Sequence, residues 1–323
     1  MIHAKENLRF ARRRVEIACL LFVLSAWSAD AQSSGGPIDS GKPACPNQLP
    51  ALSGLTYNED DTKYAAPECR AGLLNSFKYI PLRRENEEYY VSFGLWIRER
   101  SEYFSNLGLG SGPPGNAYPM HRYYGHLDLH LGDRFRFFGE LGSSIETGRN
   151  GGPRPLLDKE NLYVHQGFFD TVLWRSGKNK VTLRAGRQEV ELGSHYLVSV
   201  RDGRNIRRSF DGFRLTSEAG DWTIDAFALR PVLDNAGYFD DPPNQTQSFW
   251  GVYAVRPFRV LPGGNIDLYY FGLENKKVVI DGKGAGQDHT ETVGTRSRTF
   301  SRGSDGNAAP SERSAVAFKA PVN

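Results

Sequence analysis

The chain has 323 residues with a formal net charge of +3, and its mean hydropathy is −0.50. No stretch of the sequence reaches the 18 or more apolar residues that a transmembrane helix needs. The nearly balanced charge says nothing for or against a nucleic-acid partner, and we expect none.

The first 31 residues have the pattern of a cleaved secretory signal. A basic start precedes the apolar run Ile17 to Leu24, and the small-residue motif Ala29-Asp30-Ala31 supplies a cleavage site. The apolar run is too short to cross a bilayer. We therefore predict that residues 1–31 direct export and are then removed, which leaves a mature chain of almost neutral charge.

Residues 32–84 are rich in Pro, Gly, Ser and Asp and show no sustained hydrophobic period. This composition predicts a largely irregular periplasmic or linker segment, with one short helical turn near Ala71 to Phe77. Cys45 and Cys69 lie in this segment, and an oxidising compartment permits a disulfide between them. Two thiols with no histidine nearby make a poor site for a metal or for nucleophilic chemistry, so a bridge is the favoured interpretation.

From residue 85 to residue 298, strand patterns follow one another with little room for helices. Apolar and polar side chains alternate in these patterns, because successive side chains of a strand point to opposite faces. A tight turn at Gly132-Asp133 joins two of the segments as a hairpin. We count nine strands and an incipient tenth, at residues 89–102, 123–131, 135–145, 162–174, 181–188, 210–218, 222–229, 248–256, 266–273 and 291–298.

Two folds fit this alternation: an antiparallel membrane β-barrel, or a soluble β-protein with one wet face. Short turns alternate with long connections, and aromatic pairs such as Tyr89-Tyr90 and Tyr269-Tyr270 stand near strand ends, as in the girdles of membrane barrels. Charged residues and His also occur at mid-strand on the polar face, which suits a water-filled lumen. These features favour the barrel.

The connection between the strands at 181–188 and 210–218 is dense in arginine. Guanidinium groups stay charged and match carboxylates in shape, so this stretch predicts a site that attracts anions. A solvated, charged loop is the alternative interpretation. The arginines are Arg201, Arg204, Arg207 and Arg208, and the acids in or next to the run are Asp202 and Asp211.

Two kinds of catalytic site are weaker candidates. His126, Asp128 and His130 project from one face of a strand, but a metal site normally draws its ligands from more than one element. Motifs of common hydrolase, redox-thiol, zinc-protease and phosphate-loop sites are absent. We predict no enzyme, no metal and no cofactor. An acid/base pair for cleaving uronates would rest on residue types alone, with His165 beside Glu160 or Asp170.

The segment from Gly186 to Leu215 resembles the central signature of the bacterial alginate-export family of outer-membrane proteins, and reads GRQEVELGSHYLVSVRDGRNIRRSFDGFRL. Further matching phrases are HLDLHLGDRFRFFGEL from His126, AGDWTIDAFALRPV from Ala219 and GGNIDLYYFGL from Gly263. The resemblance runs in order from about residue 89 to residue 298. It implies an all-β, antiparallel up-and-down transmembrane barrel of 18 strands, in which an anionic polyuronate diffuses past an arginine-lined constriction.

The resemblance points first to Arg187, Arg207 and Arg208 as residues of the lumen. With the candidates that lie close to them or share lumen-side strand parity, eight arginines are predicted to line the path: Arg187, Arg201, Arg207, Arg208, Arg214, Arg184, Arg136 and Arg98. Three acids would temper the field so that successive carboxylates move on, namely Glu189, Asp202 and Asp211. Arg187 lies on the opposite strand parity to Arg184, so a bulge or a strand end is needed there.

The sequence departs from the family in two ways. It holds about half of the expected strands, and residues 299–323 show no strand period, which indicates a truncated barrel with an irregular, non-native tail. The predicted function is passive export of an alginate-like polysaccharide across the bacterial outer membrane, with membrane lipid and periplasmic export proteins as further partners. The alternative is a soluble periplasmic β-protein that binds or cleaves acidic polysaccharide.

Overall fold

The structure, a computed structural model, describes residues 54–70, 74–83, 85–105, 107–193, 195, 197–258, 264–280, 283–302 and 308–321. The chain divides into two compact units, residues 1–44 and residues 45–323, and every described residue belongs to the second. The expected secretory signal and Cys45 lie outside the described residues. Cys69, the expected partner of Cys45, is disulfide-bonded.

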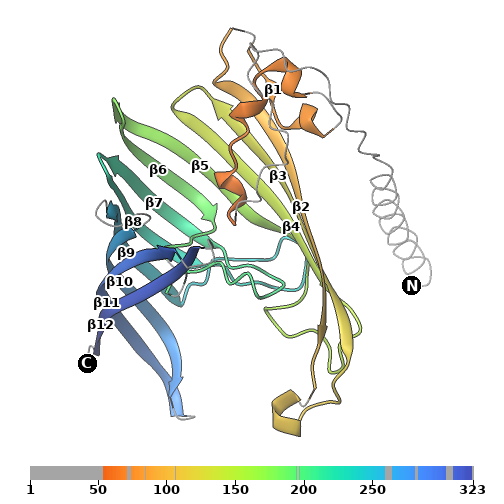
Figure 1. Cartoon of the computed structure of the whole chain (residues 1–323). Coiled ribbons are helices and arrows are strands. Elements are labelled where there is room, and N and C mark those ends of the chain that lie inside the picture. The colour runs from red at the N-terminus through yellow and green to blue at the C-terminus, as the bar shows by residue number, and fades with distance from the viewer. Residues whose placement is uncertain are drawn as a thin grey trace, which may run out of the picture. The chain divides into compact units, whose positions relative to one another are not determined.

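One antiparallel sheet contains all twelve named strands, and their order in the sheet follows the chain from β1 to β12 (Figure 1). The fold is therefore all-β and up-and-down, as the sequence predicts. Within the described residues the sheet is open, with β1 and β12 at its edges. The strands are β1 (Ile80–Pro81), β2 (Tyr89–Tyr103), β3 (Ala117–Leu131), β4 (Phe135–Glu146), β5 (Glu160–Ser176), β6 (Asn179–Gln188), β7 (Phe210–Ala219), β8 (Trp222–Pro231), β9 (Gln247–Phe258), β10 (Gly264–Ile280), β11 (Lys283–Arg302) and β12 (Ala308–Pro321).

The connections differ between the two ends of the sheet. At one end, tight turns join β3 to β4, β5 to β6 and β7 to β8. Gly177 and Gly220 each begin a two-residue turn with φ of 57° and 60°, a left-handed backbone that glycine adopts without strain. At the other end four connections are long, at residues 104–116, 147–159, 189–209 and 232–246, whereas β10 and β11 are only two residues apart. This asymmetry is the one expected of outer-membrane barrels.

The two faces of the sheet differ in chemistry, and the apolar face is the exposed one. Phe93, Leu95 and Ile97 of β2 are 40%, 59% and 50% exposed. On the opposite face, Arg122 of β3 and Glu140 of β4 are almost completely buried. A soluble sandwich has the reverse arrangement, with apolar rows inside and charges in water. We call the apolar face outer and the polar face inner.

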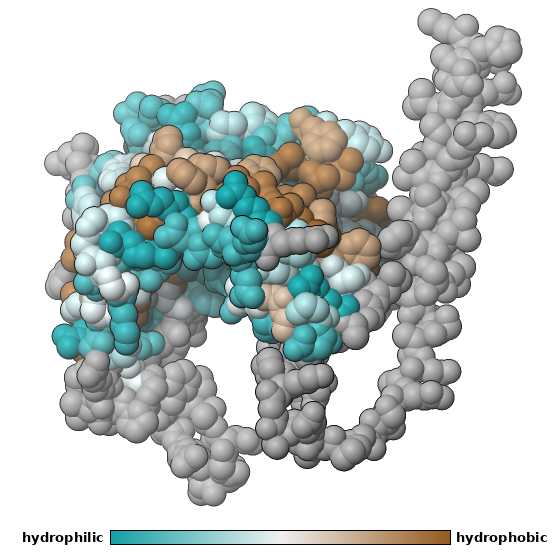
Figure 2. All heavy atoms as spheres, turned by 90° about the horizontal axis from the view of Figure 1, so that it is seen from above, coloured by the Kyte–Doolittle hydropathy of each residue, from teal (hydrophilic) through white to brown (hydrophobic). Residues whose placement is uncertain are grey.

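Figure 2 shows hydrophobic residues gathered into a band, with hydrophilic residues beside it. Exposed large apolar side chains come from neighbouring strands of the sheet, among them β2, β4, β5 and β7. In the part of the chain that the structure describes, no second sheet or α-helix packs on the outer face. The described residues also include no helix with the length and apolar character to cross a bilayer.

Two other parts of the chain cover the inner face (Figure 1). One is the N-terminal segment, residues 54–58, which contains the 3-10 helix η1 (Thr56–Asn58). The other is the connector, residues 189–209, between β6 and β7. Leu55 and Tyr57 of the segment share one buried cluster with Val200 of the connector and with aromatic residues of β4 and β5. The inner face is therefore packed with chain in this region.

Two stretches differ from the sequence-based expectation. Residues 32–84 are expected to be largely irregular, whereas the described part from residue 54 contains β1 and four 3-10 helices. An irregular tail is expected from residue 299, but β11 runs to Arg302 and β12 follows. Backbone hydrogen bonds between β11 and β12 hold this stretch in the sheet, and they require no alternation of side chains. The helices are η1, η2 (Thr62–Tyr64), η3 (Pro67–Arg70) and η4 (Asn75–Phe77), and a fifth, η5 (Leu107–Gly110), lies between β2 and β3.

Candidate functional site

The connector is held on the inner face by buried polar contacts. Asn205 has no exposed surface, and its Nδ2 donates to the backbone oxygens of His121 (3.0 Å), Ile145 (3.3 Å) and Asp158 (2.9 Å). These oxygens belong to β3, to β4 and to the connection that follows β4. One side chain thus ties the connector to three separate parts of the wall.

Two arginines of the wall hold the tip of the connector. Arg122 of β3 donates to the Asp202 carboxylate at 2.6 Å and to the Arg204 carbonyl at 2.9 Å, and its guanidinium lies 4.9 Å from the centre of the Trp96 ring. Arg98 of β2 donates to the carbonyl oxygens of the same two connector residues, at 2.6 Å each. The Asp202 side chain is 59% exposed, so a carboxylate already rests at the accessible edge of this arginine pair.

The other wall arginines that parity assigns to the lumen do stand on the inner face, but each has a carboxylate partner. The pairs join neighbouring strands, and charge-assisted hydrogen bonds of this kind neutralise much of the positive charge that an incoming anion would meet. The pairs are Arg136 with Asp128 (2.7 Å), Arg184 with Asp170 (2.8 Å) and Arg214 with Asp225 (2.8 Å).

Arg207 and Glu189 form a buried pair inside the connector. Arg207 Nε lies 2.8 Å from Glu189 Oε1, and the same oxygen lies 2.8 Å from His165 Nε2. Burial raises the pKa of Glu189 to about 8, and the charge of Arg207 opposes this rise. The carboxylate of Glu189, one of the predicted tempering acids, is bound within the protein.

Arg187 stands at the end of β6, next to the long connections. It pairs with Asp211 of β7 at 2.9 Å and donates to the carbonyl oxygens of Val164 and Asp241. In the register of β7, Asp211 has the parity of the outward Phe213. The structure therefore places Arg187 and Asp211 at the rim of the sheet, on the outer parity.

Three arginines of the connector differ from the paired arginines described above. Within the part of the chain that the structure describes, Arg201, Arg204 and Arg208 have no carboxylate oxygen within the 4.0 Å of an ion pair. Burial, together with the charges of Arg201 and Arg204, lowers the pKa of Arg208 to about 10. The pKa of Arg204 is lowered for the same reasons, by burial and by Arg201. A cluster of mutually repelling cations is a site where an added anion is favourable.

The histidines of the inner face have protein partners. Asp128 of the His-x-Asp-x-His triplet is held by Arg136, and His130 stacks on Tyr90 at 4.3 Å. Among the described residues, no three His, Cys, Asp or Glu side chains converge as a metal site would require. His165, 1% exposed, contacts Glu189 rather than the Glu160 or Asp170 of the sequence-based alternative.

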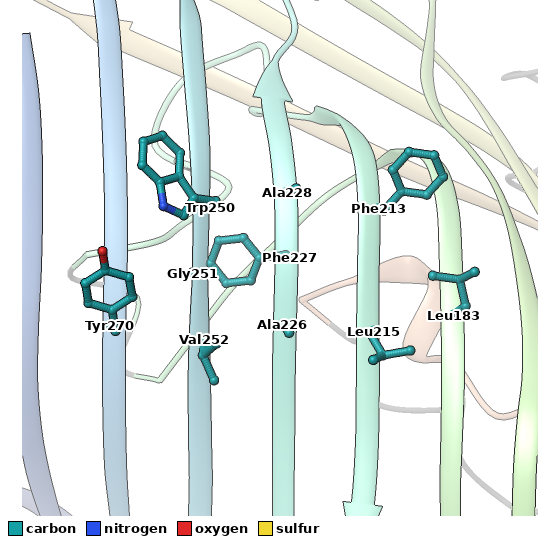
Figure 3. A pocket seen from close by; sticks show the side chains of 10 residues that line it. All are labelled: Leu183, Phe213, Leu215, Ala226, Phe227, Ala228, Trp250, Gly251, Val252 and Tyr270. Carbon is teal, nitrogen blue, oxygen red and sulfur yellow. The ribbon is translucent and has the colours of Figure 1, made fainter.

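A hollow on the outer face lies over β6 to β10 (Figure 3). Its rows follow the strand register, because Leu183, Leu215, Ala226, Val252 and Tyr270 are successive partners across the five strands. The small side chains of β8 leave room between the large side chains of its neighbours. The whole lining consists of Leu183, Phe213, Leu215, Ala226, Phe227, Ala228, Trp250, Gly251, Val252 and Tyr270.

A family model described as alginate export matches residues 89–304, from the first residue of β2 to just beyond the end of β11. The chain belongs to the alginate export family. This match confirms the resemblance that the sequence phrases predict, over almost the same residues. Alginate export proteins are an outer-membrane transport family. No curated protein and no solved structure matches the chain significantly.

Sequence reasoning missed two parts of this candidate site. Arg122 holds the connector, and the alternation that assigns Asp128 to the inner face would also have selected it. The N-terminal segment carries no such signal, since residues 54–58 have no period and their contacts lie far away in the sequence.

Proposed function

We propose that the chain forms wall and lining of an outer-membrane channel through which an alginate-like polyuronate leaves the bacterial cell passively. The observation that carries the proposal is the sidedness of the sheet, with apolar rows exposed outside and buried charges inside. Lipid is the solvent that suits exposed Phe and Leu rows, and water suits the inner face. We propose a transport protein rather than an enzyme, located in the outer membrane.

The arginines fall into two groups, one with a structural role and one that binds the polyanion. The wall arginines keep their carboxylate partners and fix the shape of the lining, while Arg201, Arg204 and Arg208 supply the uncompensated positive charge. Asp202, held by Arg98 and Arg122, occupies the place of a uronate carboxylate and can exchange with one. Several such weak contacts attract a polyanion without trapping it, as conduction requires.

The outer hollow supports membrane lipid as a partner. Its lining is apolar, and the row from Leu183 to Tyr270 has the strand parity opposite to that of Arg184 and Arg214, so it suits an acyl chain and offers nothing to a polyanion. We expect periplasmic proteins of an export complex, the remaining predicted partner, to meet the end of the sheet with the tight turns, because such turns face the periplasm in outer-membrane barrels.

Planar-bilayer recordings test the pore and the assignment of the charge. We expect the double variant Arg204→Ala with Arg208→Ala to lose most of the anion selectivity and to bind mannuronate oligomers about tenfold or more weakly, equivalent to about 1.4 kcal/mol. The matched control is Arg175→Ala with Arg256→Ala, which removes two exposed arginines that lie near carboxylates of the tight turns. Equal selectivity in the two double variants would refute the site.

Fractionation separates the channel from the alternative, a soluble periplasmic β-protein that binds or cleaves acidic polysaccharide. The channel predicts that the mature chain sediments with outer membranes and resists extraction by salt or carbonate. Recovery of folded chain in the soluble periplasm would overturn the channel in favour of the alternative.

A further inference from the structure

We propose that the N-terminal segment, residues 54–58, is an internal stopper that occupies the arginines of the inner face and must move before a polyuronate binds there. The inference rests on the proposed function, because it concerns the regulation of the same site. It assigns to this segment the role of a competing, built-in ligand.

Among the arginines predicted for the lumen, the stopper contacts Arg207, Arg136 and Arg184. The Gly54 carbonyl accepts a hydrogen bond from Arg207 at 2.5 Å, and the Tyr57 carbonyl accepts one from Arg136 at 2.6 Å. The Tyr57 ring lies 4.2 Å from the Arg184 guanidinium, within cation–π range. Each of these arginines also has a carboxylate partner in the protein, so the stopper takes up donors and ring-facing surface that this partner leaves over and that a uronate could use.

The segment is seated by specific buried contacts. The Thr56 hydroxyl donates to Glu140 at 2.6 Å and accepts from Gln166 at 3.3 Å, and Thr56 is only 2% exposed. The Tyr57 ring meets Phe138 and Phe168 edge-on, at 6.3 Å and 5.5 Å between centroids. A loosely lying tail would not satisfy a buried hydroxyl and an aromatic ring in this way.

The segment can nevertheless be displaced, because the described residues give it no strand pairing to break. Of the strand pairs and isolated bridges that the described residues form, none includes residues 54–58, so side chains and single carbonyl groups hold the segment. Its acceptors toward the arginines are uncharged, whereas a uronate offers a charged and bidentate acceptor, which makes stronger hydrogen bonds to guanidinium. A polyuronate therefore competes on favourable terms with its carboxylates.

Two states follow, one with the stopper seated and one with it displaced. A ligand that binds only the second state shows an apparent affinity reduced by the population of that state. Any change that weakens the seated state should therefore strengthen binding of the polyanion, which is the opposite of the effect of losing a true binding residue.

The test titrates purified full-length chain in detergent with defined mannuronate oligomers. We expect Tyr57→Ala to raise the apparent affinity about tenfold, equivalent to about 1.4 kcal/mol. Thr56→Val keeps the shape of the side chain and loses only its hydrogen bonds, so we expect a smaller rise. The matched control is Tyr64→Ala, which removes an equally buried ring of η2 that packs with Cys69, Tyr79 and Tyr90 instead of the arginines.

A second measurement does not depend on the fold of the alanine variant. The thiol of Thr56→Cys should react slowly with a maleimide, and saturating oligomer should accelerate the reaction. If Tyr57→Ala fails to fold, Thr56→Val and this labelling rate decide the question.

The outcomes separate the stopper from the channel. Wild-type affinity in Tyr57→Ala and Thr56→Val overturns the stopper, and it leaves the channel intact if Arg204→Ala with Arg208→Ala still weakens binding. An equal rise in Tyr64→Ala also overturns the stopper, since general loosening then explains the effect. Absence of oligomer binding in the wild type and in every variant defeats the proposed function and the stopper together.

Discussion

Asp234 sets how much positive charge the connector presents. Burial raises the pKa of its carboxyl group to about 7, Asp241 adds to the rise, and Arg208 and Arg204 oppose it. An ionised Asp234 cancels one charge of the unpaired arginines, whereas a protonated Asp234 leaves that charge uncompensated. A single carboxyl group can thus adjust the field near neutral pH, where the arginines themselves do not titrate.

We expect the preference for anions to increase as the pH falls from about 8 to about 6, because Asp234 takes up its proton across this range. Asp234→Asn should lose this part of the pH dependence. It should show the stronger anion preference of the low-pH wild type over the whole pH range. Reversal potentials under a salt gradient measure the effect in both proteins. A variant with the full pH dependence of the wild type would show that another group is responsible.

The strands and the connector are encoded in different ways. The alternation within β2 to β4 is local, and it correctly assigns Phe93 and Leu95 to the outer face and Arg98 to the inner face. The connector takes its position from contacts between residues far apart in the sequence, such as Arg122 with Asp202, which are 80 positions apart. No pattern within residues 189–209 reveals such partners, so the sequence predicts a cationic loop but not its course across the inner face.

The same contrast explains the remaining differences. Arg187 fits the family phrase but not the lumen-side parity, and the strand end places its side chain with Asp211 at the rim. The N-terminal segment reads as linker because its buried contacts with Glu140 and Arg207 are made across long sequence separations.

A substitution at Asn205 tests how strongly the position of the connector depends on the hydrogen bonds of this side chain. Asn205→Asp replaces an amide donor with a carboxylate that faces three backbone oxygens, so we expect a loss of about 3 kcal/mol or more in the free energy of unfolding. The variant should also be cleaved by proteases within residues 189–209. Urea unfolding and limited proteolysis measure both effects. The control is Asn150→Asp, an exposed amide with one backbone acceptor at 2.9 Å; an equal loss in both variants would contradict the anchor.

At the scale of the whole molecule, a substitution on the outer face distinguishes a lipid-facing surface from a water-facing one. Leu95 is 59% exposed in the middle of β2. In a soluble protein, an arginine at such a position changes stability little, but facing the middle of a bilayer it costs about 2–4 kcal/mol. We therefore expect Leu95→Arg to lower the stability of the chain folded in lipid vesicles by that amount.

The measurement is denaturant unfolding from vesicles, with Leu109→Arg as the control because Leu109 is fully exposed on η5, outside the strands. If Leu95→Arg is as harmless as Leu109→Arg, the outer face does not meet lipid.

The strictly sequential strand order also implies an order of folding steps. Every strand finds its partner in the adjacent stretch of chain, so hairpins can be added one after another with little loop entropy to overcome. The connector and the N-terminal segment depend on partners as far as 153 residues apart, and they can settle only once those strands stand in place. An immature sheet would therefore pass through a stage in which its cations are uncovered, and at that stage it would be most open to premature capture of polyanions.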